Sequence, residues 1–186
     1  GWRVGTGFLS TPLILDVLTE IDLESAYRLL ENEELPGWLS MPKNGATTIW
    51  EAWEGPNSQH GGIGSLNHYS KGAVVAWLFE TMCGIRVVGE NHFVLAPHPG
   101  GQFTHAKACY NSVYGRVESG WEKTPDGWHY TITIPANCTA AAVSCPVVSK
   151  AKQEGIRCNL DYSATRIHSR YAAVASFWVA LSQGLA

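Results

Sequence analysis

Two carboxylates and two tryptophans share residues 45–54, with the sequence Gly-Ala-Thr-Thr-Ile-Trp-Glu-Ala-Trp-Glu. Glu51 follows Trp50, and Glu54 follows Trp53. An indole face stacks on the weakly polar C–H face of a pyranose ring, and a carboxylate in a partly dry pocket can transfer protons. This combination predicts a sugar site in which one or both carboxylates do chemistry.

A second polar cluster, residues 65–69 (Ser-Leu-Asn-His-Tyr), follows a glycine-rich loop and opens an apolar segment. At a helix start His68 could bind a ligand, or it could be a capping or core histidine. The seven histidines have no metal-ligand spacing and the five cysteines form no C-x-x-C pair, so no metal site is predicted. Ser10, Ser65 and Ser112 lack the context of a nucleophile elbow, which disfavours a serine hydrolase.

The composition indicates a folded globular protein. Its 186 residues are 45% apolar and 16% charged, enough for one ordinary domain or two small ones. The net charge of −3 is small and no block of like charges occurs, so neither nucleic acid nor an anionic membrane is an expected partner. No apolar run approaches the roughly 20 residues of a membrane-spanning helix, and the N-terminus does not resemble a signal peptide. The five cysteines are odd in number and irregularly spaced, which predicts free thiols and a cytoplasmic location.

The elements that must position these residues begin as helices. Thr11-Pro12 is expected to open a helix that runs to about residue 21, with Thr11 as its cap and Pro12 at its first position. A second helix is predicted over residues 23–32, ended by Pro36-Gly37. A third is predicted over residues 67–83, where an almost continuous apolar pattern indicates burial on most sides.

The chain then changes to a pattern typical of strands. We predict strands over residues 92–96, 103–110, 114–123, 128–135 and 139–148, with a hairpin turn at Pro125-Asp126-Gly127. Trp121 and Trp128, on neighbouring strands, are interpreted as core. The fold class is thus α+β, with a helical segment over residues 1–88, a β-sandwich-like domain over 89–148 and an atypical tail over 149–186. A helix is predicted in that tail over residues 168–181.

Four blocks of sequence follow one another in a recognisable order. They are residues 7–13 (Gly-Phe-Leu-Ser-Thr-Pro-Leu), 45–53, 65–69 and 92–99 (His-Phe-Val-Leu-Ala-Pro-His-Pro). Together they resemble the C-terminal end of bacterial α-L-rhamnosidases. The likeness continues through residues 112–115 to 134–137, and covers roughly residues 1–143.

The resemblance implies that the helical part is the closing portion of an (α/α)₆ barrel, followed by the family's C-terminal β-sandwich. It also implies inverting hydrolysis of terminal α-L-rhamnosides with no cofactor. Glu51 matches the family's general base, whereas Glu54 is interpreted as a structural or secondary sugar contact. The substrate-binding residues implied are Trp50 and Trp53 as walls of the rhamnose subsite, His68 as a hydrogen-bonding partner of a hydroxyl, and Asn67 and Thr48.

Two departures from the family leave alternatives open. The family's general acid lies upstream of these blocks, in a segment that this sequence does not contain, and the chain after about residue 144 does not resemble the family's last strands. We therefore expect a truncated product that carries a base without its acid. The alternatives are a non-catalytic carbohydrate-binding or structural protein, and a shortened chain with an acquired, unrelated hydrolase activity. Apolar helix faces left bare by an incomplete barrel predict a homo-oligomer.

Overall fold

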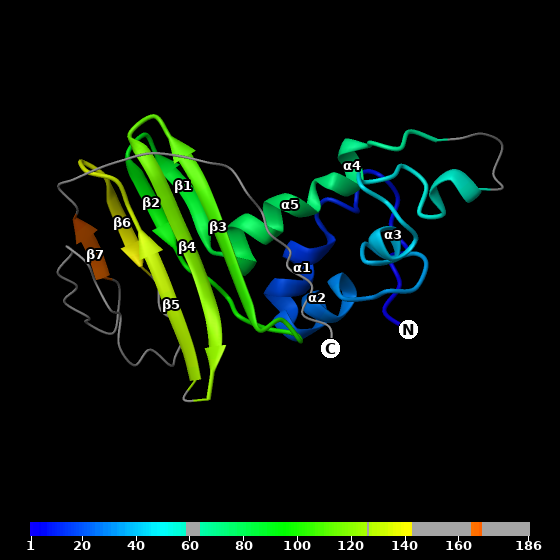
Figure 1. The fold of residues 1–186 in the computed structure, drawn as a ribbon, viewed down its shortest axis with the longest axis horizontal. Coiled ribbons are helices and arrows are strands. Elements are labelled where there is room, and N and C mark those ends of the chain that lie inside the picture. The colour runs from blue at the N-terminus through cyan, green and yellow to red at the C-terminus, as the bar shows by residue number, and fades with distance from the viewer. Residues whose placement is uncertain (59–63, 126, 143–164, 169–186) are drawn as a thin grey trace. The chain divides into compact units, whose positions relative to one another are not determined.

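The computed structural model describes residues 1–58, 64–125, 127–142 and 165–168, and divides the chain into two compact units (Figure 1). The first unit comprises Gly1–Trp77 with Gly100–Gln102, and the second Leu78–Pro99 with Phe103–Ala186. Helices followed by small sheets confirm the predicted α+β class. The predicted boundary between residues 88 and 89 stays a prediction.

In the first unit, α1 (Ile14–Ile21) and α2 (Leu23–Leu30) pack against each other and are separated by one residue. That residue, Asp22, is extended, and its Oδ2 accepts a hydrogen bond of 3.0 Å from the Ser25 backbone N–H, which caps α2. Tyr27 of α2 is fully buried and meets Trp77 edge-on, with ring centroids 5.1 Å apart. Both predicted helices are therefore present.

The predicted ends of these helices need correction. Thr11 does not cap α1, because its hydroxyl donates to the carbonyl oxygens of Thr6 and Gly7, and α1 begins only after Leu13. The second helix ends at Leu30, before the predicted stop at Pro36-Gly37.

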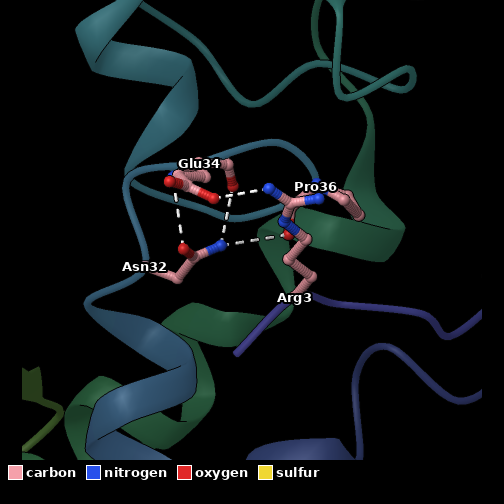
Figure 2. Close-up of polar contacts among 4 residues, drawn as sticks. All are labelled: Arg3, Asn32, Glu34 and Pro36. Carbon is pink, nitrogen blue, oxygen red and sulfur yellow. Dashed lines mark hydrogen bonds and ion pairs between the residues drawn. The ribbon is translucent and has the colours of Figure 1, made fainter. Parts of the chain in front are cut away.

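A polar loop ends the α2 segment (Figure 2). The Asn32 side-chain amide donates to the carbonyl oxygens of Glu34 and Pro36, at 2.7 and 3.3 Å, and its oxygen accepts from the Glu34 N–H. Arg3, near the N-terminus, forms an ion pair of 2.5 Å with the Glu34 carboxylate. The loop thus closes on itself through Asn32 and holds the N-terminal segment.

The predicted third helix is three short helices: α4 (Tyr69–Gly72), α5 (Val74–Trp77) and the π-helix η2 (Leu78–Met82). It begins after His68, whose backbone is extended, rather than at Asn67. Two more short helices, α3 (Ser40–Lys43) and η1 (Gly55–Asn57), were not predicted, because one helical turn leaves no periodic pattern. No helix among the described residues has both the length and the apolar character needed to cross a bilayer.

The second unit holds two sheets. One has the order β1-β2-β6-β7, formed by Ile85–Gly89, His92–Leu95, Thr139–Ala142 and Thr165–His168; the other is β3-β4-β5, formed by His105–Ser112, Gly115–Thr124 and Gly127–Thr133. Neighbours are antiparallel except β2 and β6, which are parallel. Phe93 of β2 meets Tyr110 of β3 edge-on, with centroids 6.4 Å apart, so the sheets face each other as in a sandwich.

The predicted strands are confirmed with small shifts of their ends, and residues 143–148 of the last one lie outside the described residues. Two strands, β1 and β7, were missed. β1 lies almost wholly in the range assigned to the helical segment and is exposed beyond Ile85, so no alternation of buried and exposed residues marked it. The hairpin is confirmed, since Thr124 pairs with Gly127, whose φ is +128°. Trp121 is 3% exposed and donates to the Met82 carbonyl oxygen, as expected of a core residue. Trp128, which meets it edge-on, is half-buried.

Two predictions fall largely outside the described residues. His168 belongs to strand β7, which corrects the start of the helix predicted over residues 168–181, and the rest of that helix lies outside them. Of the five cysteines, Cys83, Cys109 and Cys138 are free and buried, and the other two, Cys145 and Cys158, also lie outside.

Candidate functional site

The two predicted site segments, residues 45–54 and 65–69, lie side by side. The Glu51 N–H donates to the Ser65 carbonyl oxygen at 2.8 Å, and the His68 N–H donates to the Ile49 carbonyl oxygen at 2.8 Å. The exposed Thr48 adds a hydrogen bond from its hydroxyl to the Leu66 carbonyl oxygen. The backbone thus sets Glu51 and His68, two predicted site residues from different blocks, on adjacent segments.

Glu51 is half-buried, and its carboxylate is oriented by backbone. Oε2 accepts a hydrogen bond of 2.7 Å from the Ser65 N–H. Gly64 faces the same carboxylate, since a Cβ at that position would lie 3.4 Å from Oε2. A charge-assisted bond to a backbone donor fixes the carboxylate more firmly than a contact to a mobile side chain would.

The Trp50 ring packs inward. It is 6% exposed and lies against Gly55, where a Cβ would stand 2.1 Å from Cε3 of the ring. Gly55 has a φ of +57°, so both its backbone and its missing side chain allow this approach. The arrangement gives Trp50 a packing role directly before Glu51, and its predicted sugar contact stays a prediction.

Trp53 is half-buried and belongs to a cluster that includes a cation. Its ring meets that of Trp38 edge-on, with centroids 5.8 Å apart and an interplanar angle of 87°. Lys71 Nζ lies 4.0 Å from the Trp53 ring centroid, within the range of a cation–π contact. The buried Trp38 holds the Lys71 backbone, because its Nε1–H donates to the Lys71 carbonyl oxygen at 3.0 Å.

Lys71 is a charged residue that the sequence analysis did not single out. It is only 4% exposed, and its Nζ donates to the carbonyl oxygen of Glu51. Burial lowers the pKa of Lys71 to about 8, and the negative charges of Glu54 and Glu51 partly oppose that shift. The sequence signal that could have pointed to Lys71 is a lone lysine in the first turns of an otherwise apolar segment.

His68 occupies the N-cap position of α4. Its Nδ1 accepts a hydrogen bond of 3.3 Å from the Ser70 N–H, so the neutral imidazole carries its proton on Nε2. The ring stacks on Phe8, with centroids 4.8 Å apart, and on Tyr69 at 5.2 Å. The capping role that the sequence left open is therefore present, and it leaves Nε2–H as the donor of the neutral ring.

Phe8, which the sequence analysis did not single out, brings the first block to the site. Its carbonyl oxygen accepts a hydrogen bond of 2.8 Å from the buried Ser70 hydroxyl. Asn67 and Glu54 are exposed. Within the ranges that the structure describes, no three His, Cys, Asp or Glu residues gather as metal ligands would.

Comparisons with protein families and with known proteins identify what this chain is similar to. A family model described as the bacterial alpha-L-rhamnosidase 6 hairpin glycosidase domain matches residues 1–82, and one described as the bacterial alpha-L-rhamnosidase C-terminal domain matches residues 88–178. The second match extends into the tail that the sequence analysis set apart. The chain is similar to the alpha-L-rhamnosidase of Streptomyces avermitilis, 36% identical over 75% of this chain, and to that of Formosa agariphila, 38% identical over 73%.

The chain is also similar to a solved structure. The chain superimposes on the Streptomyces avermitilis alpha-L-rhamnosidase complexed with L-rhamnose with a TM-score of 0.73 and 30% identity, over 91% of this chain and 18% of that one. The chain spans 14% and 15% of the length of the two curated relatives. These proteins therefore contain far more polypeptide than the chain described here.

Proposed function

Because this chain belongs to the bacterial α-L-rhamnosidase family, we propose that it supplies the base-bearing part of a site that hydrolyses terminal α-L-rhamnosides, with Glu51 as the general base. The observation that carries the proposal is that hydrogen bonds between residues 49–51 and 65–68 set Glu51 and His68 on adjacent segments, with Trp53 two residues after Glu51. A carboxylate can act on the glycosidic bond, and an indole can stack on a sugar ring.

The proposed mechanism inverts the configuration at the anomeric carbon of the sugar. The Ser65 N–H holds Oε2 of Glu51, so Oε1 is the oxygen that takes a proton from the attacking water. An inverting site leaves about 6.5–9.5 Å between its two carboxyl groups, because the water must fit between the base and the sugar. The acid that protonates the leaving oxygen is proposed to come from another part of a complete family enzyme.

The proposed sugar contacts divide by chemistry. Trp53 offers an apolar ring face, and His68 offers Nε2–H to a hydroxyl oxygen. Asn67 is exposed in the middle of the second segment, and Thr48 and Trp50 precede Glu51. Trp50 serves the site by supporting the backbone of Glu51, in addition to its predicted contact with rhamnose.

The test is hydrolysis of 4-nitrophenyl α-L-rhamnoside, whose good leaving group needs little acid assistance. Glu51→Gln should reduce turnover on the order of 10²-fold or more, because the amide cannot accept the proton. Glu54→Gln, the matched control, should stay within a few-fold of wild type. Equal turnover by wild type and Glu51→Gln would remove Glu51 from the mechanism.

A non-catalytic role in binding carbohydrate is the second candidate, favoured by the half-buried Trp53 indole, whose apolar ring can stack on a sugar without any catalytic step. It predicts that L-rhamnose binds while the aryl rhamnoside is not turned over. Calorimetric titration with L-rhamnose decides it, since a chain that neither binds the sugar nor gains thermal stability from it contradicts this role.

Self-association also stays a proposal. Leu13, which precedes α1, and Val17 and Ile21 within it are 60%, 50% and 77% exposed. Their spacing of four residues places them in one stripe along the helix. A second copy of the chain could cover this stripe with its own, as in a two-fold symmetric interface.

A further inference from the structure

Lys71, the Glu51 carbonyl oxygen and the Trp53 ring form a contact group that none of the predicted site roles includes. Nζ touches both partners, as donor to the carbonyl and as cation 4.0 Å from the ring centroid. The lysine backbone is held in turn by the Trp38 indole. One ammonium group therefore joins the main chain of the proposed base to the ring of the proposed sugar platform.

We propose that Lys71 is a positioning residue whose ammonium fixes the Trp53 ring and the Glu51 main chain relative to each other, so that loss of its proton loosens the sugar platform. The inference rests on the proposed function only in calling Trp53 a sugar platform. Nζ lies over one face of the Trp53 indole.

The positive charge of Lys71 indicates that the side chain does more than fill space. An apolar side chain of similar length would fill the same space without the cost of removing a cation from water. The ammonium instead makes two directed contacts, of which the cation–π contact requires the positive charge. A neutral amine can still donate to the Glu51 carbonyl, so deprotonation releases the ring first.

The surroundings of Lys71 set the pH at which this happens. The charged groups acting on it are Glu54 and Glu51, and both favour its protonated form, whereas burial favours the neutral one. Burial prevails and brings the pKa to about 8. The release of Trp53 is therefore expected near that pH rather than near the ordinary value for lysine, 10.5.

The test follows the Trp53 indole N–H by NMR as the pH is raised through about 8, with the signal identified by its loss in Trp53→Phe. In the wild-type chain we expect the signal to shift with a midpoint near the pKa of Lys71. Lys71→Arg should abolish this transition, because arginine stays charged, and Lys71→Met should hold the signal at one position throughout. Lys43→Met, at an exposed lysine paired with Glu33, is the control and should leave the transition intact.

L-rhamnose titration separates this inference from the proposed function. If the sugar binds, its affinity should fall about tenfold as the pH passes above the transition in wild type, as expected for one lost cation–π contact, and should not fall in Lys71→Arg. A Trp53 transition that Lys71→Arg abolishes, without any rhamnose binding, supports the positioning role and contradicts the proposed function. A Trp53 signal that does not titrate, or titrates equally in Lys71→Arg, overturns the positioning role even if rhamnose binds.

Discussion

Gly55 is the residue on which the packing of Trp50, directly before Glu51, most depends. Its φ of +57° lies in the left-handed region, and a Cβ there would stand 2.1 Å from Cε3 and 2.3 Å from Cζ3 of the Trp50 ring. Gly55→Ala therefore imposes two independent costs, one from the backbone and one from the clash. Gly45 separates them, since its φ is +85° and nothing lies within 4 Å of its Cβ position.

The magnitudes follow from these geometries. A non-glycine residue in the left-handed region costs about 1–2 kcal/mol, and this is the whole expected effect of Gly45→Ala. Overpacking a buried ring by a methyl group costs a further ~1–3 kcal/mol. Gly55→Ala should thus lower the free energy of unfolding by about 2–5 kcal/mol, clearly more than the control.

Urea unfolding followed by far-ultraviolet circular dichroism measures both variants. In a Trp50→Leu background the clash is relieved, so the cost of Gly55→Ala should fall to that of Gly45→Ala. Equal destabilisation by Gly55→Ala and Gly45→Ala in the wild-type background would refute the reasoning. A cost of Gly55→Ala that is unchanged by Trp50→Leu would also refute it.

Three further predictions concern other parts of the molecule. Trp121→Phe removes the indole donor from the buried Met82 carbonyl and should lower the free energy of unfolding by about 1–3 kcal/mol; an unchanged urea midpoint would contradict this. The pKa of Lys71 is lower in the folded protein, about 8, than the ordinary 10.5, so between these pH values the unfolded chain binds the proton and the folded chain does not. The free energy of unfolding, taken as the difference between wild type and Lys71→Met, should therefore rise with pH across that window and be flat below it; a difference that falls there has the wrong sign. Val17→Glu should weaken concentration-dependent self-association seen by light scattering, whereas Val113→Glu, at the 94% exposed turn between β3 and β4, should not; identical scattering by both would exclude the α1 stripe.

Local sequence determined most of the elements. The period of apolar residues gave α1 and α2, and alternation gave β4 and β5 with the turn at Gly127, because those signals depend only on neighbours in the chain. Prediction from local sequence failed where the apolar residues follow no periodic pattern. α3 is a single turn, and β1 is exposed on most of its length.

The tertiary structure alone decided how the site is built. The sequence predicted Glu51, Trp53 and His68 as site residues, because residue type and order are the information on which that prediction rests. It could not show that the Ser65 N–H orients Glu51, that Phe8 stacks on His68, or that Lys71 reaches both Glu51 and Trp53. Such contacts join segments that the chain keeps apart, and their strength depends on burial, which only the packed fold sets.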